Sequence, residues 1–91
     1  MTEAPWDLVV AGPARRAIDR LPERIALALL DYLVGPLLEN PHRVGKPLRG
    51  DLVGLHSSRV GAYRIVYEID NRSHTIRVLY IDHRADIYRP R

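Results

Sequence analysis

Apolar and polar residues along the chain recur with two different periods, which divide the sequence into strands and helices. Residues 62–70 show the two-residue period of a strand with one buried face, because Tyr63, Ile65, Tyr67 and Ile69 alternate with a more polar set. Further strands are predicted by β-branched runs between turn residues at 6–11, 52–58 and 74–82. "RVG" (59–61) and "NRS" (71–73) are predicted to be the turns between the last three strands.

Two segments show the period of amphipathic helices. Pro13 suits the first turn of a helix that runs to about Leu21, with apolar residues spaced at three and four. A second helix is predicted from about Glu23 to Leu38, with one broad apolar stripe. The pair Gly35-Pro36 is expected to kink or end it. Residues 39–51 have the composition of a loop.

The element order β-α-α-β-β-β favours an α+β fold in a single domain that spans residues 1–91. Consecutive strands with short turns form an antiparallel sheet, and the two-helix hairpin is expected to bury its apolar stripe on one face of that sheet. The opposite face would stay uncovered. Because strand side chains alternate, Arg64 is expected on the uncovered face if Tyr63 and Ile65 contact the helices.

Charge is distributed unevenly along the chain. Residues 1–41 carry four arginines against six acids, whereas residues 42–91 carry nine arginines and Lys46 against five acids. Arginine binds phosphate through a two-pronged fork, so a basic second half favours nucleic acid or an acidic protein as partner. A genome that uses arginine in place of lysine would explain the excess of arginine over lysine, but it explains the asymmetry between the halves less well.

Several classes of protein are disfavoured by composition. Without cysteine there are no disulfides and no cysteine-based zinc sites, which permits a cytoplasmic location. The first ten residues lack the pattern of a signal peptide. The longest apolar run, "IALALL", is far shorter than the roughly 20 residues of a membrane span. Paired acids with metal-ligand spacing are also missing, so neither a metal nor a cofactor is expected.

The chain ends in "YIDHRADIYRPR" (80–91), which combines His83, Arg84, Tyr88 and Arg89. These residues form either a solvated tail or part of a site for an anion. Arginines of this segment, together with those at 59 and 64, could neutralise the transition state of a phosphodiester. A histidine can move a proton and a tyrosine can stack on a base. The combination points to metal-free RNA cleavage, in which the ribose 2′-OH attacks the adjacent phosphate.

Three segments resemble the RelE family of bacterial toxins. They are "PARRAIDRLP" (13–22), "GKPLRGDLVGLHSSRVGAYRIVYEID" (45–70) and "HRADIYR" (83–89), and together they cover most of the chain in the family's order. The resemblance implies a small antiparallel sheet with two helices on one face. It also implies ribosome-dependent cleavage of mRNA in the A site and neutralisation by a cognate antitoxin. Operator DNA would be contacted only through the toxin–antitoxin complex.

Roles for individual residues follow from the same resemblance. Arg64 in "YRIVY" matches the family's phosphate-binding arginine, and Arg84 matches an arginine that stabilises the transition state or protonates the leaving oxygen. Tyr88 matches the aromatic residue that stacks on the substrate. His83 corresponds to a histidine that some members use as a general acid or base. Arg59 occupies the turn where members often carry basic residues.

One departure from the family leaves the general base open. Some members carry a pair of lysines before the "YR" segment, where this chain has "LHSS" (55–58). His56 and His83 are the two candidates for the base. The cations expected to contact RNA without taking part in catalysis are Lys46, Arg49 and Arg89.

Two other functions remain open at this stage. A ParE-like toxin shares the scaffold but inhibits DNA gyrase without cleaving RNA, and the His-Arg-x-x-x-Tyr ending favours the nuclease over it. A non-catalytic module would bind only an antitoxin and operator DNA. On each of these hypotheses the partner is an antitoxin, whose helix or strand would bind the exposed flank of the helical pair or the open face of the sheet.

Overall fold

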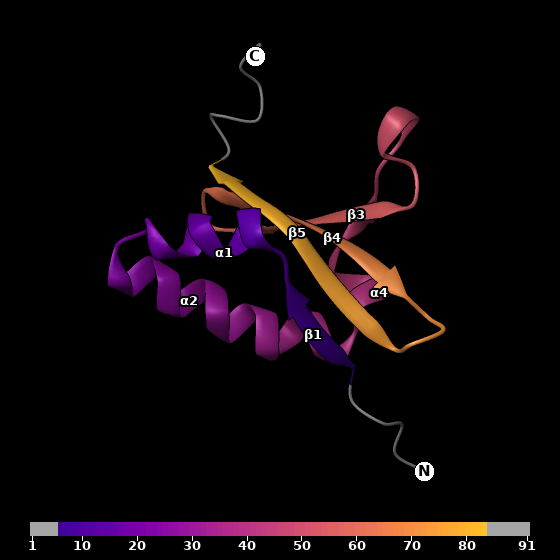
Figure 1. Ribbon diagram of the computed structural model, residues 1–91, viewed down its shortest axis with the longest axis horizontal. Coiled ribbons are helices and arrows are strands. Elements are labelled where there is room, and N and C mark those ends of the chain that lie inside the picture. The colour runs from indigo at the N-terminus through magenta and orange to yellow at the C-terminus, as the bar shows by residue number, and fades with distance from the viewer. Residues whose placement is uncertain (1–5, 84–91) are drawn as a thin grey trace.

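A five-stranded sheet forms the centre of the structure, a computed structural model that describes residues 6–83 (Figure 1). Three residues of the predicted site, Arg84, Tyr88 and Arg89, therefore lie outside the described residues. The strands are β1 (Asp7–Val10), β2 (Lys46–Pro47), β3 (Leu55–Val60), β4 (Tyr63–Asp70) and β5 (Thr75–His83). Their order across the sheet is β1-β5-β4-β3-β2.

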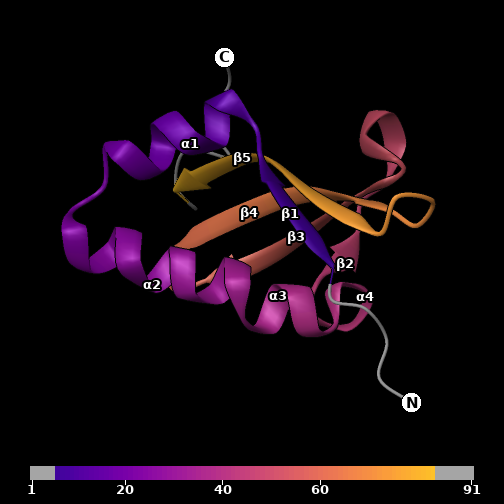
Figure 2. The ribbon, with the colours of Figure 1, turned by 60° about the horizontal axis from the view of Figure 1, so that its bottom comes forward.

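Helices α1 (Gly12–Asp19) and α2 (Glu23–Val34) form the predicted hairpin beside the sheet (Figure 2). Pro13 lies in the first turn of α1, and α2 ends immediately before Gly35-Pro36, as the sequence predicts. Two single turns follow, α3 (Pro36–Glu39) and α4 (Pro41–Val44), and a short 3-10 turn spans Gly50–Leu52. No helix within residues 6–83 is long and apolar enough to span a membrane.

The sheet differs from the predicted antiparallel one in three respects. β2 adds a fifth strand within the segment predicted as a loop. β1 runs parallel to β5, because the helical hairpin carries the chain away before it returns to the sheet. β3 begins later than predicted and continues to Val60, since Gly61, with φ of 60°, and Ala62 form the turn by themselves. The prediction that Arg59 lies in this turn is therefore wrong. Arg59 is a strand residue that lies directly opposite Arg64 on β4.

The core lies between the helices and one face of the sheet. Its fully buried residues are Ala14, Leu29, Leu33 and Leu37 from the helical side and Ile65, Tyr67, Ile76 and Val78 from the sheet. Residues that pair directly across antiparallel strands point to the same face. Ser58, Ile65 and Ile81 pair in this way and face the core, whereas Arg59, Arg64 and Asp82 form the next paired row. This row points to the uncovered face, which confirms the predicted side of Arg64.

Gly45 is required by the packing around Tyr67. The Tyr67 hydroxyl donates a hydrogen bond of 2.7 Å to the Pro41 carbonyl, and burial raises the pKa of Tyr67 to about 12. A Cβ atom at Gly45 would lie 2.1 Å from the Tyr67 hydroxyl oxygen and 2.8 Å from the Ser57 carbonyl oxygen. Only glycine leaves room for this contact between β2, β3 and β4.

Gly45→Ala is therefore expected to lower the free energy of unfolding by about 1–3 kcal/mol, because the core must shift to admit the methyl group. Chemical denaturation measures this change. Gly12→Ala is the control, since the nearest atom there is the end of the flexible Arg16 side chain, at 3.0 Å. Adding Tyr67→Phe should recover part of the lost stability by removing the closest atom. Wild-type stability of Gly45→Ala would contradict this account.

Candidate functional site

A pocket with a volume of about 380 Å³ opens at the edge of the sheet where β2 ends. We call it the cationic pocket; its lining residues are Tyr32, Val44, Lys46, Ser57, Ser58, Arg59 and Arg64. β2 pairs with β3 only through Lys46 and Pro47, opposite Ser57 and His56. On the side away from β4, the rest of β3 thus lacks a neighbouring strand within the described residues, and the pocket lies along this edge.

Strand register brings the three cations of the cationic pocket together. Arg59 lies directly opposite Arg64, and Lys46 lies opposite Ser57, which is two residues from Arg59 on the same face. Side chains at directly opposed positions have Cβ atoms about 5 Å apart. Asp82 lies directly opposite Arg64 on its other side, so the three cations outnumber the one carboxylate in the neighbouring row. Like charges held this close repel each other, so an anion bound between them would be stabilised.

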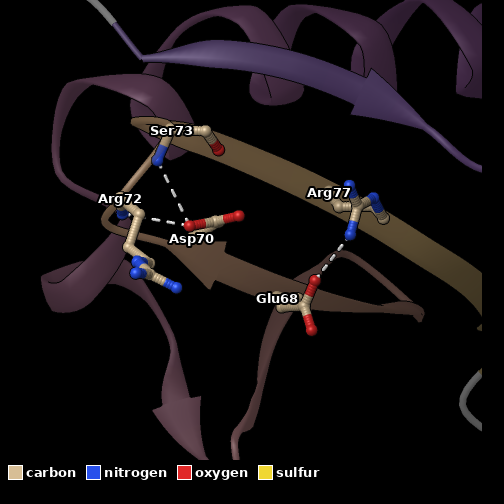
Figure 3. A network of polar contacts seen from close by, with 5 residues as sticks. All are labelled: Glu68, Asp70, Arg72, Ser73 and Arg77. Carbon is tan, nitrogen blue, oxygen red and sulfur yellow. Dashed lines mark hydrogen bonds and ion pairs between the residues drawn. The ribbon is translucent and has the colours of Figure 1, made fainter.

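Charges at the other end of the uncovered face are balanced (Figure 3). Arg77 and Glu68 form an ion pair of 2.8 Å between β5 and β4. Asp70 accepts hydrogen bonds from the backbone N–H groups of Ser73 and Arg72, and the bond from Ser73 is the main cause that lowers the pKa of Asp70. Unbalanced positive charge is therefore concentrated at the cationic pocket.

A chain of hydrogen bonds forms one wall of the cationic pocket. Ser58 is 5% exposed and donates to the Val44 carbonyl oxygen at 3.1 Å. Its hydroxyl also shares a hydrogen bond with Tyr32. Because the single hydroxyl proton of Ser58 points to Val44, Tyr32 is the donor to Ser58. These bonds tie α2 and α4 to β3 and hold the strand edge in place beneath the cations.

His83 does not join the cationic pocket. It pairs with Tyr63 across β5 and β4, one position beyond the pair of Asp82 with Arg64. Its ring meets the ring of Tyr63 edge to face, with centroids 5.1 Å apart. Asp82 shares the uncovered face with Arg64, its partner on β4. Because side chains alternate along β5, His83 lies on the helix side. The structure therefore does not place His83 beside Arg64, and its role as a general acid or base stays a prediction from the resemblance.

His56 also faces away from the cationic pocket. It pairs with Tyr67 and its ring stacks on that side chain, with centroids 5.7 Å apart. On its other side it meets His42, which in turn contacts Trp6. Since Arg59 points to the opposite face of β3, the proposed role of His56 as general base is not supported by this geometry.

The environment of His56 predicts a pH-dependent stability. Burial, followed by the proximity of His42, lowers the pKa of His56, and its Nδ1 atom is buried without a hydrogen-bond partner among the described residues. Because the folded-state pKa lies below the unfolded value of about 6.5, neutral His56 stabilises the fold. This contribution is complete above pH 6.5 and is lost as the pH falls through the folded-state pKa.

The melting temperature should therefore fall between about pH 7 and pH 5, before most carboxylates titrate. In His56→Gln the fall over this range should be smaller than in the wild type. His74→Gln is the matched control, because His74 is also partly buried but its ring stacks on Trp6, with centroids 3.8 Å apart. Equal pH profiles for wild type and His56→Gln would contradict the assignment.

Of two other cations predicted to contact RNA, the structure places one in the cationic pocket and one outside it. Lys46, expected in a loop, belongs to β2 and lines the cationic pocket. Arg49 is exposed ahead of the 3-10 turn and does not line the pocket. Tyr32 and Ser58 were missed by the sequence analysis. Alternation could have placed Ser58 beside Ile65, but Tyr32 reaches Ser58 through the packing of α2, which has no sequence signal.

Comparison with known proteins identifies similar toxins. The sequence model of a family described as "ParE toxin of type II toxin-antitoxin system, parDE" matches residues 8–88. A Mycobacterium tuberculosis protein named "Toxin RelE" is 49% identical over 85 residues, which cover 93% of this chain and 88% of that protein. "Toxin RelG" of the same organism is 46% identical over 85 residues, with 93% of this chain and 98% of that protein covered.

Solved structures agree with the fold. The crystal structure of the Mycobacterium tuberculosis toxin–antitoxin complex RelBE2 contains a chain that is 42% identical, with a TM-score of 0.85. The match covers 89% of this chain and 100% of that one. The isolated RelE toxin of Escherichia coli is 22% identical with a TM-score of 0.71, covering 86% of this chain and 83% of that one. At that identity the likeness concerns the fold alone.

Proposed function

Because this chain belongs to the RelE/ParE superfamily of toxins from type II toxin–antitoxin systems, we propose that it is a ribosome-dependent mRNA endonuclease whose cationic pocket binds the scissile phosphate. The observation that carries the proposal is the convergence of Lys46, Arg59 and Arg64 on one small pocket. Such a protein would act in the cytoplasm, where the ribosome presents mRNA. It is expected to need neither a metal nor a cofactor.

The reaction is an attack of the ribose 2′-oxygen on the adjacent phosphorus. A new bond forms between the 2′-oxygen and phosphorus while the bond from phosphorus to the 5′-oxygen breaks. The 2′-hydroxyl loses its proton and the 5′-oxygen gains one, which yields a cyclic phosphate and a free 5′-OH. Negative charge on the phosphoryl oxygens rises in the transition state, and the guanidinium groups of Arg59 and Arg64 are placed to neutralise it.

Lys46 is our candidate for proton transfer to the leaving 5′-oxygen. The two histidines predicted for acid–base chemistry face the other side of the sheet. A guanidinium does not release its proton, whereas a lysine ammonium can. Among the described residues that line the pocket, Tyr32 is the other group with an acidic proton, and that proton is directed to Ser58. Lys46 thus takes over the role that the sequence analysis left to histidine.

Two further residues stay in the proposal on the resemblance alone. Arg84 would add a third guanidinium at the transition state, and Tyr88 would stack on a base beside the cleaved bond. Both lie outside the described residues but, like Arg64, within the part of the chain that the family's sequence model matches. Arg89, also outside the described residues, is retained only as a contact to substrate.

A cognate antitoxin is the proposed protein partner. The similar Mycobacterium tuberculosis toxin was crystallised in a complex with its antitoxin. In this chain Leu27, Leu30 and Val34 are exposed on the outer side of α2, at the three- and four-residue spacing that an amphipathic helix recognises. The complex, rather than the toxin alone, would bind operator DNA.

Inhibition of DNA gyrase is the second candidate function, because the matching family model carries a ParE description. The cationic pocket favours the nuclease, since a protein that only binds gyrase has no need to concentrate three cations around one pocket.

The deciding experiment maps RNA ends after expression of the toxin without antitoxin. We expect new 5′-OH ends confined to translated reading frames, and none of these ends when Arg64→Ala is expressed. Growth arrest with intact mRNA and DNA-damage signalling would favour the gyrase inhibitor. Harmless expression of the wild-type protein would favour a non-catalytic module.

A further inference from the structure

Lys46 belongs to a strand that few backbone hydrogen bonds attach to the sheet. β2 consists of Lys46 and Pro47 alone, and proline has no N–H group to donate to β3. Beyond it, the Leu48 N–H donates to the Leu55 carbonyl oxygen at 2.8 Å. Because so short a strand forms few ladder bonds, contacts of the preceding segment are needed to hold Lys46 in place.

The preceding segment ends with α4, and a side chain of β3 caps this helix. Val44 is the last residue of α4, so its carbonyl oxygen has no hydrogen-bond partner inside the helix. Ser58 donates to this oxygen at 3.1 Å, and Tyr32 of α2 donates to Ser58. Because Ser58 is buried, water has little access to replace these bonds. The Tyr32–Ser58 pair therefore fixes the backbone two residues before Lys46.

The start of α4 is held by a different side chain. Tyr67 donates to the Pro41 carbonyl oxygen at 2.7 Å, and Tyr67 is a fully buried residue of the core. This bond therefore serves the fold as a whole. The Tyr32–Ser58 pair, by contrast, lines the cationic pocket beside Lys46.

The pair is placed to act on Lys46 and not on the substrate. Ser58 faces the core, whereas Arg59, the next residue of β3, faces the other way. Both hydroxyl protons are used inside the protein, since that of Ser58 points to Val44 and that of Tyr32 points to Ser58. Neither residue therefore supplies a proton or a charge to the phosphate.

We propose that Tyr32 and Ser58 are positioning residues for Lys46, which hold this lysine where its ammonium group can reach the leaving 5′-oxygen. The inference rests on the proposed function and deepens it, because it adds the side chains that set the rate of proton transfer. The pair acts through the backbone at Val44. It therefore contributes to proton transfer and not to phosphate binding by the two arginines of the pocket.

The test compares variants in single-turnover cleavage of ribosome-bound mRNA and of the same mRNA with sulfur in place of the 5′-oxygen. We expect Ser58→Ala to reduce the rate with the normal substrate by about 10–10²-fold, the loss that a misplaced group causes. The half-saturating concentration should stay unchanged. The sulfur substrate should restore most of the rate, because a thiolate leaves without needing a proton.

Tyr32→Phe and the double variant test whether the two residues act together. Tyr32→Phe should lose less activity than Ser58→Ala, because Ser58 can still donate to Val44. The double variant should be no slower than Ser58→Ala, since both residues act through one bond. Tyr80→Phe is the matched control, as it removes the same hydroxyl from β5, outside the cationic pocket, and should leave both rates unchanged.

A general structural role would give a different pattern. Equal losses with the two substrates, or a raised half-saturating concentration, would overturn the inference. Wild-type activity of Ser58→Ala would overturn it as well.

Backbone ¹⁵N relaxation tests the same contact without cleavage. In Ser58→Ala the order parameter of the Lys46 amide should fall below the value of about 0.85 that is typical of rigid backbone, while that of the Arg64 amide stays unchanged. An unchanged order parameter at Lys46 would overturn the inference whether or not the protein cleaves RNA. Absence of cleavage by the wild type would count against the proposed function, whereas the relaxation result judges the contact between the pair and Lys46 by itself.

Discussion

Arg64→Ala is expected to reduce the rate of mRNA cleavage on the ribosome by about 10²–10³-fold, the usual loss when one preorganised donor to a developing oxyanion is removed. Arg64 lies on the uncovered face, opposite Arg59 on one side and Asp82 on the other. Its side chain reaches the cationic pocket without supporting the core, which lies on the other face of β4. The variant should therefore fold normally, and single-turnover cleavage measures the loss.

Arg77→Ala is the matched control for this prediction. Arg77 also projects from the uncovered face, but it pairs with Glu68 at the far end and does not line the pocket. Its removal deletes the same charge and should leave cleavage nearly unchanged. Arg64→Lys should restore part of the rate, since it returns a positive charge without the fork. Equal losses for Arg64→Ala and Arg77→Ala would mean that net charge matters and the pocket does not.

Lys46→Arg is expected to reduce the rate by about 10²–10⁴-fold, the range for loss of a general acid or base. This substitution keeps the positive charge at the site but removes a group that can release a proton. Lys46→Gln removes both and should be at least as inactive. The measurement is again single-turnover cleavage, with a substrate whose 5′-oxygen is replaced by sulfur as a second probe.

The sulfur substrate provides the internal control. A 5′-thiolate leaves without needing a proton, so this substrate should restore most of the rate to Lys46→Arg but none of the rate lost by Arg64→Ala. If Lys46→Arg cleaves the normal substrate at the wild-type rate, the role of Lys46 is electrostatic and the proton comes from elsewhere.

Much of the fold follows from local pattern. The alternation around Tyr63 and Ile65 identified β4 and the side on which Arg64 lies, and the Gly35-Pro36 pair marked the end of α2. These features depend on residues that are close together in the sequence, so the local pattern is enough to predict them. The parallel pairing of β1 with β5 joins residues almost seventy positions apart, and no local period encodes it.

The site was predictable to the extent that its residues lie on strands with clear alternation. Arg64 met this condition. Arg59 falls in the predicted turn "RVG" (59–61), but Gly61 and Ala62 make the turn alone, so Arg59 belongs to β3. His56 and His83 lie close in the sequence to Arg59 and Arg84, which favours a shared site. One step along a strand reverses the face, however, and this separates His83 from Asp82 and from Arg64.

Lys46 shows what only the three-dimensional structure could add. It belongs to a two-residue strand that is too short to be recognised by pattern, and its position follows from pairing with Ser57. The tight contact of Gly45 with Tyr67 fixes that strand against the sheet.

The most direct test of the cationic pocket is an NMR titration with a 2′-deoxy analogue of the substrate, which binds but lacks the attacking hydroxyl. The side-chain resonances of Arg59 and Arg64 and the Lys46 ammonium group should shift together as the analogue saturates, while the His56 ring stays unchanged. If the resonances of Arg59, Arg64 and Lys46 stay unchanged while those of other arginines shift, the assignment of this pocket as the phosphate site is contradicted.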